Sequence, residues 1–168
     1  METLPKRKKI RLDDPLYTGG YVYFVTVCTY NRIECLGEIV DGEMILNSVG
    51  MIVSDRIQTL PEYFDLVIEN QVIMPNHIHF LVSSNKIHLS KIVSSLKRHC
   101  VMNIKNTVSA GERSSPLREV IESKNTIWQK SYYDRIVRNQ KEYDQIWQYI
   151  DQNPLRWEFD SLHPENNK

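Results

Sequence analysis

The chain has 168 residues, of which 41% are hydrophobic and 25% are charged, and its 21 basic and 21 acidic side chains cancel. This composition is ordinary for a globular protein, and it excludes a disordered chain, a collagen-like fibre and a low-complexity scaffold. The longest apolar stretches, such as residues 22–27, are far shorter than the roughly 18 to 20 residues that a membrane helix needs. The N-terminus is a basic run without an apolar signal core, and the three cysteines form no CxxC pair. We therefore expect a cytoplasmic protein without a membrane segment, a disulfide framework or a zinc knuckle.

The charges are unevenly distributed along the neutral chain. Residues 1–11 hold five basic side chains against Glu2, and residues 91–105 hold four basic side chains and no acid. Residues 34–69 carry eight acidic side chains against Arg56 alone. This segregation lets a neutral protein present one face to a polyanion. A solvated basic arm and an exposed helix face would explain the same pattern.

The hydrophobic pattern predicts strands and helices in a mixed order. Asp41-Gly42 lies between two short apolar runs and indicates a tight hairpin turn, and Asn47 or Ser48 can cap the helix that follows. In chain order we expect a strand at 21–30, a hairpin at 39–46, a helix that stops at Pro61, strands at 64–74 and 77–83, a helix with its apolar stripe at 89–100, a loop at 107–118, a strand centred on 127–137, and a helix at 139–152.

Without the hairpin and the last helix, this order is βαββαβ. It predicts an α+β fold of the ferredoxin-like type, in which two helices cover one face of an antiparallel sheet. The last helix has its own apolar stripe, which includes Ile146 and Ile150, and we expect it to lie across the open face of the sheet. We predict a single domain at 19–157, between a basic arm at 1–18 and a polar tail at 158–168 that frays.

The segment MPNHIHFLV, from Met74 to Val82, carries the first candidate site. Side chains alternate across a strand, so His77 and His79 leave on one face while Ile78 and Phe80 leave on the other. The two imidazoles then point to the open face of the sheet, at a spacing that suits two ligands of one metal ion. Two satisfied polar side chains would give the same pattern.

The second candidate site lies at the end of the last predicted helix. Tyr149 and Asn153 are four residues apart, which places both on one side of a helix, although Pro154 disfavours a helical conformation at Asn153. The chain has nine tyrosines, and a tyrosine taken alone is more often a packing residue than a nucleophile. Asn before Pro is also an ordinary helix stop.

Together these motifs resemble a known family. A turn and strand reading Pro75-Asn76-His77-Ile78-His79, a Trp128-Gln129 strand and a helix ending in Tyr149 to Pro154 are similar to the single-tyrosine HUH transposases of bacterial insertion sequences. The resemblance is strongest to the REP-associated tyrosine transposases and runs from about Gly19 to Trp157. It implies a metal-dependent endonuclease and strand transferase that cleaves single-stranded DNA near hairpins through a 5′-phosphotyrosine intermediate.

The resemblance also implies roles for individual residues. His77, His79 and Asn153 would bind a divalent metal, Mg²⁺ or Mn²⁺, and Tyr149 would be the catalytic nucleophile. Tyr132, Tyr133 and Tyr143 are competing nucleophiles; we expect one of the first two to be core and the other to face DNA. The basic side chains expected to contact phosphate are Lys6, Arg7, Lys8, Lys9, Arg11, Lys97, Arg98, Arg135 and Arg138.

Other functions fit parts of the pattern. A DNA-binding protein that has lost catalysis would keep the fold and the basic face, and a rolling-circle initiator would share the histidine motif. A metal-dependent hydrolase of small phosphoesters would need a water-activating base, for which Asp134 or Asp151 could be argued. The expected partner is single-stranded DNA with hairpin or palindromic structure, and the protein is either a monomer or a homodimer that exchanges the tyrosine helix.

Overall fold

The computed structural model describes residues 21–84, 88–111 and 116–167, so the basic arm at 1–18 lies outside the described residues. Its centre is a four-stranded antiparallel sheet in the order β4-β5-β1-β6. The strands are β1 (Tyr21–Cys28), β4 (Leu66–Met74), β5 (His77–Ser84) and β6 (Tyr133–Val137). In this order β1 and β5, the first and third strands of the sheet in sequence, form the middle pair. That is the order of the ferredoxin-like fold, and the predicted fold class is confirmed.

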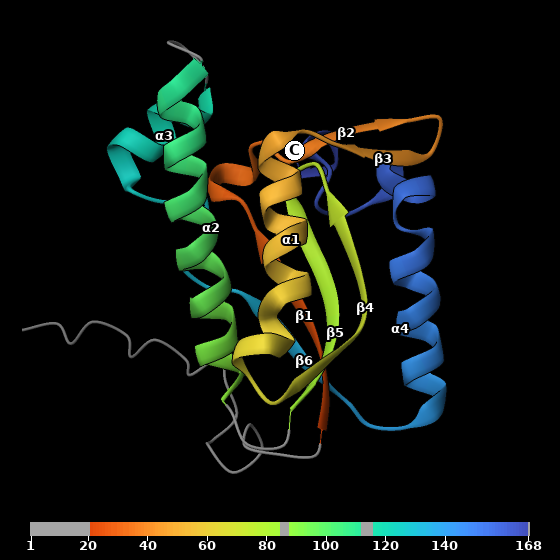
Figure 1. Ribbon diagram of the computed structural model, residues 1–168. Coiled ribbons are helices and arrows are strands. Elements are labelled where there is room, and N and C mark those ends of the chain that lie inside the picture. The colour runs from red at the N-terminus through yellow and green to blue at the C-terminus, as the bar shows by residue number, and fades with distance from the viewer. Residues whose placement is uncertain (1–20, 85–87, 112–115, 168) are drawn as a thin grey trace, which may run out of the picture.

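Helices cover the sheet on both faces (Figure 1). The main core forms where α1 (Ser48–Tyr63), α2 (Leu89–Gly111) and α3 (Pro116–Lys124) pack on one face. The odd-numbered residues of β1 and the even-numbered residues of β5 supply the sheet side of this core, including Val25 and Phe80. On the other face, α4 (Gln140–Gln152) buries Ile146 and Ile150 against Leu81 of β5. The predicted position of the last helix is thus confirmed.

A small hairpin of β2 (Gly37–Val40) and β3 (Glu43–Leu46) follows β1. Its turn residues Asp41 and Gly42 both have positive φ, 51° and 79°, as a two-residue hairpin turn requires. A Cβ atom on Gly42 would lie only 2.6 Å from the Leu155 side chain. The hairpin tip therefore lies directly against the segment that follows α4.

The ends of the predicted helices are only partly right. Asn47 caps α1 as predicted, because its side chain accepts hydrogen bonds from two backbone N–H groups of the first turn. The helix, however, continues through Pro61 to Tyr63, and closes with the Phe64 N–H bonded to the Leu60 carbonyl. One proline near a helix end removes a single backbone hydrogen bond and keeps a helical φ, so it did not stop the helix.

The loop predicted at 107–118 and the strand predicted around 127–137 are only partly right, and residues 112–115 lie outside the described part of the chain. α2 continues to Gly111 and α3 begins at Pro116, where a proline suits the first helical turn because its φ is already helical. β6 covers only Tyr133–Val137, and Trp128 forms one isolated bridge with Thr29.

The C-terminal segment is folded rather than frayed. After α4 the chain forms two 3-10 helices, η3 (Pro154–Phe159) and η4 (Pro164–Asn167). Trp157 and Asp160 are buried, and the Asn76 side chain donates a hydrogen bond of 2.9 Å to the Leu162 carbonyl. In the part of the chain that is described, no helix has both the length and the apolar character needed to cross a lipid bilayer.

Candidate functional site

The two histidines of β5 lie buried on the face that α4 covers. The Nδ1 atom of His77 lies 2.8 Å from the side-chain oxygen of Asn76, and Nδ1 of His79 lies 2.8 Å from the Thr26 hydroxyl. Because an amide oxygen only accepts, Nδ1 of His77 carries the proton and Nε2 keeps its lone pair. The Thr26 hydroxyl can accept in the same way from His79. These partners orient both rings so that Nε2 is the atom that keeps its lone pair, as for metal-binding histidines.

Asn153 lies at the end of α4 and keeps a helical conformation despite the proline that follows, with φ −58° and ψ −43°. Its side-chain nitrogen donates a 2.9 Å hydrogen bond to Asp160. The other Asp160 oxygen accepts from the Leu162 backbone N–H. Asp160 thereby fixes the amide, so that the Asn153 oxygen is the atom left to accept.

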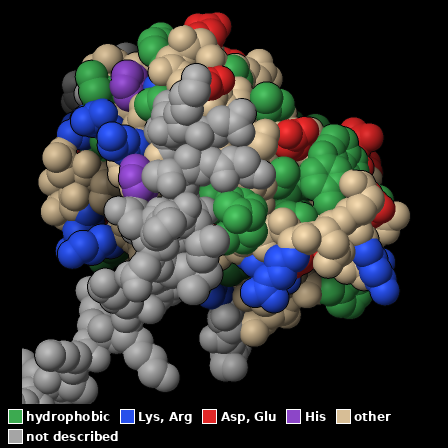
Figure 2. Space-filling view, turned by 90° about the horizontal axis from the view of Figure 1, so that it is seen from below, with side chains coloured by type: hydrophobic (Ala, Val, Ile, Leu, Met, Phe, Trp, Pro, Cys, Tyr) green, Lys and Arg blue, Asp and Glu red, His purple; other side chains and the backbone are tan. Residues whose placement is uncertain are grey.

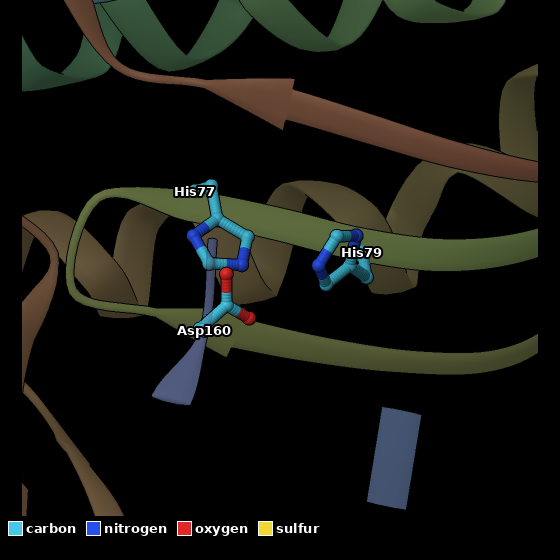
Figure 3. Close-up of side chains that lie close together, drawn as sticks. All are labelled: His77, His79 and Asp160. Atoms are coloured by element: carbon cyan, nitrogen blue, oxygen red, sulfur yellow. The ribbon is translucent and has the colours of Figure 1, made fainter. Parts of the chain in front are cut away.

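Two buried acceptor atoms of this cluster lack a hydrogen-bond partner among the described residues. They are Nε2 of His77 and Oδ1 of Asn153. Buried polar atoms are normally paired, and two unpaired lone pairs side by side suit a cation. His77, His79 and Asp160 also each offer a ligand atom within 4.8 Å of the others, and Figure 3 shows the Asp160 carboxylate directed at the His77 ring. Imidazole nitrogens combined with amide and carboxylate oxygens fit a divalent ion such as Mn²⁺ or Mg²⁺.

Tyr149 brings a hydroxyl group to the same cluster. Its oxygen lies 3.3 Å from Nε2 of His79 and donates to Asp160 across 3.3 Å. Its ring packs edge-on against Phe24, with the centroids 6.0 Å apart. The residue is 41% exposed and lines a pocket at the surface. A molecule at the surface can therefore contact this tyrosine.

Burial determines the protonation of these groups. It lowers the pKa of His77 to about 3, with the nearby positive charge of Arg32 adding to the effect, and it holds the pKa of His79 well below its usual range. Both imidazoles are therefore neutral at physiological pH and keep the lone pairs that a metal needs. Burial and the Asp160 carboxylate raise the pKa of Tyr149 to about 12. The phenol accordingly keeps its proton at neutral pH.

The buried histidines predict how the stability of the metal-free protein depends on pH. The folded pKa values lie below the unfolded value, so the unfolded chain binds more protons and stability rises with pH. From about pH 6.5 down towards pH 3, we expect the free energy of unfolding to fall by roughly 1 kcal/mol per pH unit through His77, and His79 adds to the fall in the same direction. Urea denaturation at a series of pH values measures this slope. The double variant with His77→Gln and His79→Gln should flatten it, and an unchanged slope would contradict the burial effect.

Asp160 predicts a shift in the pKa of Tyr149. Asp160→Asn removes a negative charge and an acceptor beside the phenol, so the pKa of Tyr149 should move back towards its ordinary value of about 10. NMR titration of protein carrying ¹³C-labelled tyrosine follows this group, with Tyr149→Phe used for assignment. Glu158→Gln removes an exposed carboxylate from the same segment and should leave the titration unchanged. Equal titrations in wild type and Asp160→Asn would show that the carboxylate does not act on Tyr149.

The other predicted nucleophiles lie at different distances from this cluster. Tyr132 is buried in the main core and Tyr133 is 60% exposed. One of the pair is therefore core, as expected, and the contact of the other with DNA stays a prediction. Tyr143 packs against Trp147 on α4, with ring centroids 5.7 Å apart. Tyr149 is the tyrosine whose hydroxyl is hydrogen-bonded to this cluster in the described part of the chain.

The four predicted DNA-binding residues that the structure describes are not gathered in one place. Arg135 lines a pocket beside Tyr149 and pairs with Glu142 at 3.2 Å, and Arg138 follows at the exposed end of β6. Lys97 and Arg98 belong to α2 on the other face of the sheet, and the Lys97 ammonium donates to the Gln129 and Ser131 carbonyls. On the face drawn in Figure 2, Lys and Arg side chains of the described residues lie in two areas, one on each side of the grey atoms. The residues from Lys6 to Arg11 lie outside the described part of the chain.

Asp160 is the site residue that the sequence pattern did not reveal. It follows a 3-10 helix in a polar segment with several other acids, and no periodicity relates it to the histidines. Trp157 is the residue in the sequence that could have indicated this position of Asp160. A tryptophan is usually buried, so its presence in a polar segment indicates that the chain turns back onto the domain. Its ring lies 5.9 Å from the His77 ring, between centroids.

Residues 17–153 of the chain match the family described as Transposase IS200 like. The chain belongs to the IS200-like transposase family. The matched residues include His77, His79, Tyr149 and Asn153, whereas Asp160 lies beyond them. Membership of this family gives the chain a transposase-like role in DNA metabolism.

Two relatives are similar to this transposase over nearly its whole length. An uncharacterized protein of Haemophilus influenzae (strain ATCC 51907 / DSM 11121 / KW20 / Rd) is 33% identical over 174 residues, covering 94% of this chain and 93% of the relative. The solved structure of a REP-associated tyrosine transposase bound to a REP hairpin is 17% identical, with a TM-score of 0.62. That comparison covers 90% of this chain and 76% of the other, and it shows a shared fold.

Proposed function

We propose that this transposase is a metal-dependent endonuclease and strand transferase that acts on single-stranded DNA near hairpins, with Tyr149 as the nucleophile. One observation carries the proposal: the Tyr149 hydroxyl lies 3.3 Å from Nε2 of His79, in the cluster that holds the unpaired acceptors of His77 and Asn153. A phenol beside a cation site is the arrangement that attack on a phosphodiester needs.

In the proposed reaction, the Tyr149 oxygen attacks the scissile phosphorus. A bond forms between this oxygen and phosphorus, while the bond from phosphorus to the 3′ oxygen of the preceding nucleotide breaks. The phenol proton passes to Asp160, whose carboxylate is 3.3 Å away, and the leaving 3′ oxygen takes a proton from solvent. A second 3′-hydroxyl can reverse the step because phenoxide is a fair leaving group. The same residues would thus cut and rejoin strands without a nucleotide cofactor.

His77, His79 and Asn153 would hold a divalent ion, and Asp160 offers a further oxygen close by. Such an ion supplies Lewis-acid chemistry, drawing negative charge from the phosphate and lowering the barrier to attack. Asn76 and Thr26 keep the two rings oriented for it through their hydrogen bonds to Nδ1. Asp160 does the same for the Asn153 amide.

The proposed substrate is DNA because the side chains around Tyr149 can contact both parts of a nucleotide. Arg135 can contact a phosphate, and the rings of Phe24 and Tyr133 can stack on a base. Arg135 lines the pocket beside Tyr149. Together with Arg138, which follows β6, and the basic arm at 1–18, it would contact the DNA backbone and make binding salt-dependent. The similar structure was solved with a REP hairpin, which supports a hairpin in the substrate. The domain itself would span 19–157, with the site reaching into the segment at 158–168, and the cytoplasm would be its place of action.

The site needs no second copy of the chain. α4 packs on the sheet of its own chain, so Tyr149 lies beside the histidines of the same polypeptide. The connection from β6 to α4 is only two residues long, from Val137 to Gln140, which is too short for the helix to reach far. We therefore propose a monomer as the active form, with a helix-exchanged homodimer as the alternative.

A panel of hairpin-bearing single-stranded oligonucleotides tests the function. The protein is incubated with each one in Mn²⁺ or in EDTA, and covalent adducts are scored on a denaturing gel. The proposal predicts an adduct with a subset of the panel in Mn²⁺ and none in EDTA or with hairpin-free duplex DNA. Salt-dependent binding without any adduct would favour the non-catalytic DNA-binding protein, and the absence of binding would contradict a DNA substrate.

A further inference from the structure

A pocket of about 410 Å³ opens beside Tyr149, between α4 and the strands β1 and β6. Tyr149 forms one wall, and Phe24, which stacks on His79 with ring centroids 5.1 Å apart, forms another. The pocket is thus continuous with the site through two shared side chains. Its volume lies within the roughly 300 to 1,000 Å³ of ligand pockets.

The pocket walls combine aromatic rings with hydrogen-bonding side chains. Phe24 and the 60% exposed Tyr133 present ring surface, and Gln145 of α4 presents an amide that both donates and accepts. Arg135 also lines the pocket, and its pairing with Glu142 across 3.2 Å holds the guanidinium near the rim. Aromatic side chains stack on bases, and a Gln amide can pair with two atoms of a base edge. A small phosphoester has no flat apolar part to occupy such walls.

We propose that this pocket receives the unpaired base of a nucleotide that flanks the scissile phosphate, with Tyr133 and Phe24 as stacking partners and Gln145 as the reading group. This inference rests on the proposed function. A base is tied to its phosphate through one sugar, so a phosphorus within reach of the Tyr149 oxygen brings an adjacent base to the mouth of the pocket. The pocket then makes cleavage depend on the identity of that one base.

Base-analogue scanning of a hairpin oligonucleotide tests the pocket. 2-Aminopurine, which loses fluorescence when it stacks, is placed at each unpaired position in turn, and Tyr149→Phe protein is used so that binding is measured without cleavage. We expect strong quenching at one position next to the cleaved bond and loss of that quenching in Tyr133→Ala and Tyr133→Leu. Binding should weaken by between about 5-fold and 150-fold in these variants, the range for loss of one stacked base.

Tyr63→Ala is the matched control, because Tyr63 is 63% exposed and lies at the end of α1 on the other face of the sheet. It should leave quenching and affinity unchanged. Gln145→Ala should reduce the preference between bases at the quenched position while the quenching remains.

The outcomes separate this inference from the proposed function. If the wild-type protein forms the metal-dependent adduct but Tyr133→Ala and Tyr63→Ala behave alike at every position, the pocket inference is wrong and the function stands. If the protein binds no oligonucleotide of the panel, both are wrong.

Discussion

Tyr149→Phe is expected to abolish covalent capture of DNA while leaving non-covalent binding intact. The substitution removes the phenol hydroxyl that lies 3.3 Å from Nε2 of His79, and it keeps the ring that packs against Phe24. Loss of the nucleophile from a covalent enzyme costs on the order of 10⁶ in rate, so the adduct should fall below detection. Denaturing gels measure the adduct, and filter binding or fluorescence anisotropy measures affinity for the same oligonucleotide.

Tyr143→Phe and Tyr133→Phe are the controls for this prediction. Both keep an aromatic ring and lose one hydroxyl, as Tyr149→Phe does, but neither hydroxyl is hydrogen-bonded to His79 or Asp160. Adduct formation should persist in both. An adduct of normal yield in Tyr149→Phe would assign the nucleophile to another tyrosine and overturn the role proposed here.

His77→Gln is expected to weaken Mn²⁺ binding by at least about 100-fold. Loss of a residue that only orients a ligand costs about 10- to 100-fold in metal affinity, and a direct ligand should cost no less. The Nε2 atom of His77 is buried, neutral and without a hydrogen-bond partner among the described residues, so its lone pair is available to the ion. Isothermal titration with MnCl₂ measures the affinity without DNA or turnover.

His99→Gln provides the matched control for the metal measurement. His99 lies on α2, which packs on the face of the sheet away from the cluster, and its replacement should not change Mn²⁺ affinity. Thermal unfolding of both variants shows that they are folded. Equal Mn²⁺ affinity in wild type, His77→Gln and His99→Gln would contradict a metal centre at β5.

The parts of the site that follow from local geometry could be predicted from the sequence. Alternation along a strand places His77 and His79 on one face whatever the rest of the fold, and four-residue spacing places Tyr149 and Asn153 on one side of a helix. The apolar stripe of that helix then determines which face of the sheet it covers. These short-range rules bring four residues from two distant segments into one cluster.

Asp160 could not be predicted because its position depends on contacts that are distant in sequence. The chain reaches the site only after η3, held by the Asn76 bond to the Leu162 carbonyl and by Trp157 beside His77. Composition alone makes this segment polar and acidic, which predicts fraying rather than burial. The start of α3 was missed for a similar reason, since polar residues around 116–118 favour a loop, whereas Leu117 and Ile121 pack in the main core.

The most direct test of the account is to identify the atom of the protein to which DNA becomes attached. Wild-type protein is incubated with a hairpin oligonucleotide and Mn²⁺, the adduct is digested with protease and nuclease, and the linked peptide is sequenced by mass spectrometry. We expect a peptide in which Tyr149 carries the 5′-phosphate of the downstream fragment, together with an upstream fragment ending in a 3′-hydroxyl. A linkage to another residue, or a fragment ending in a 3′-phosphate, would contradict it.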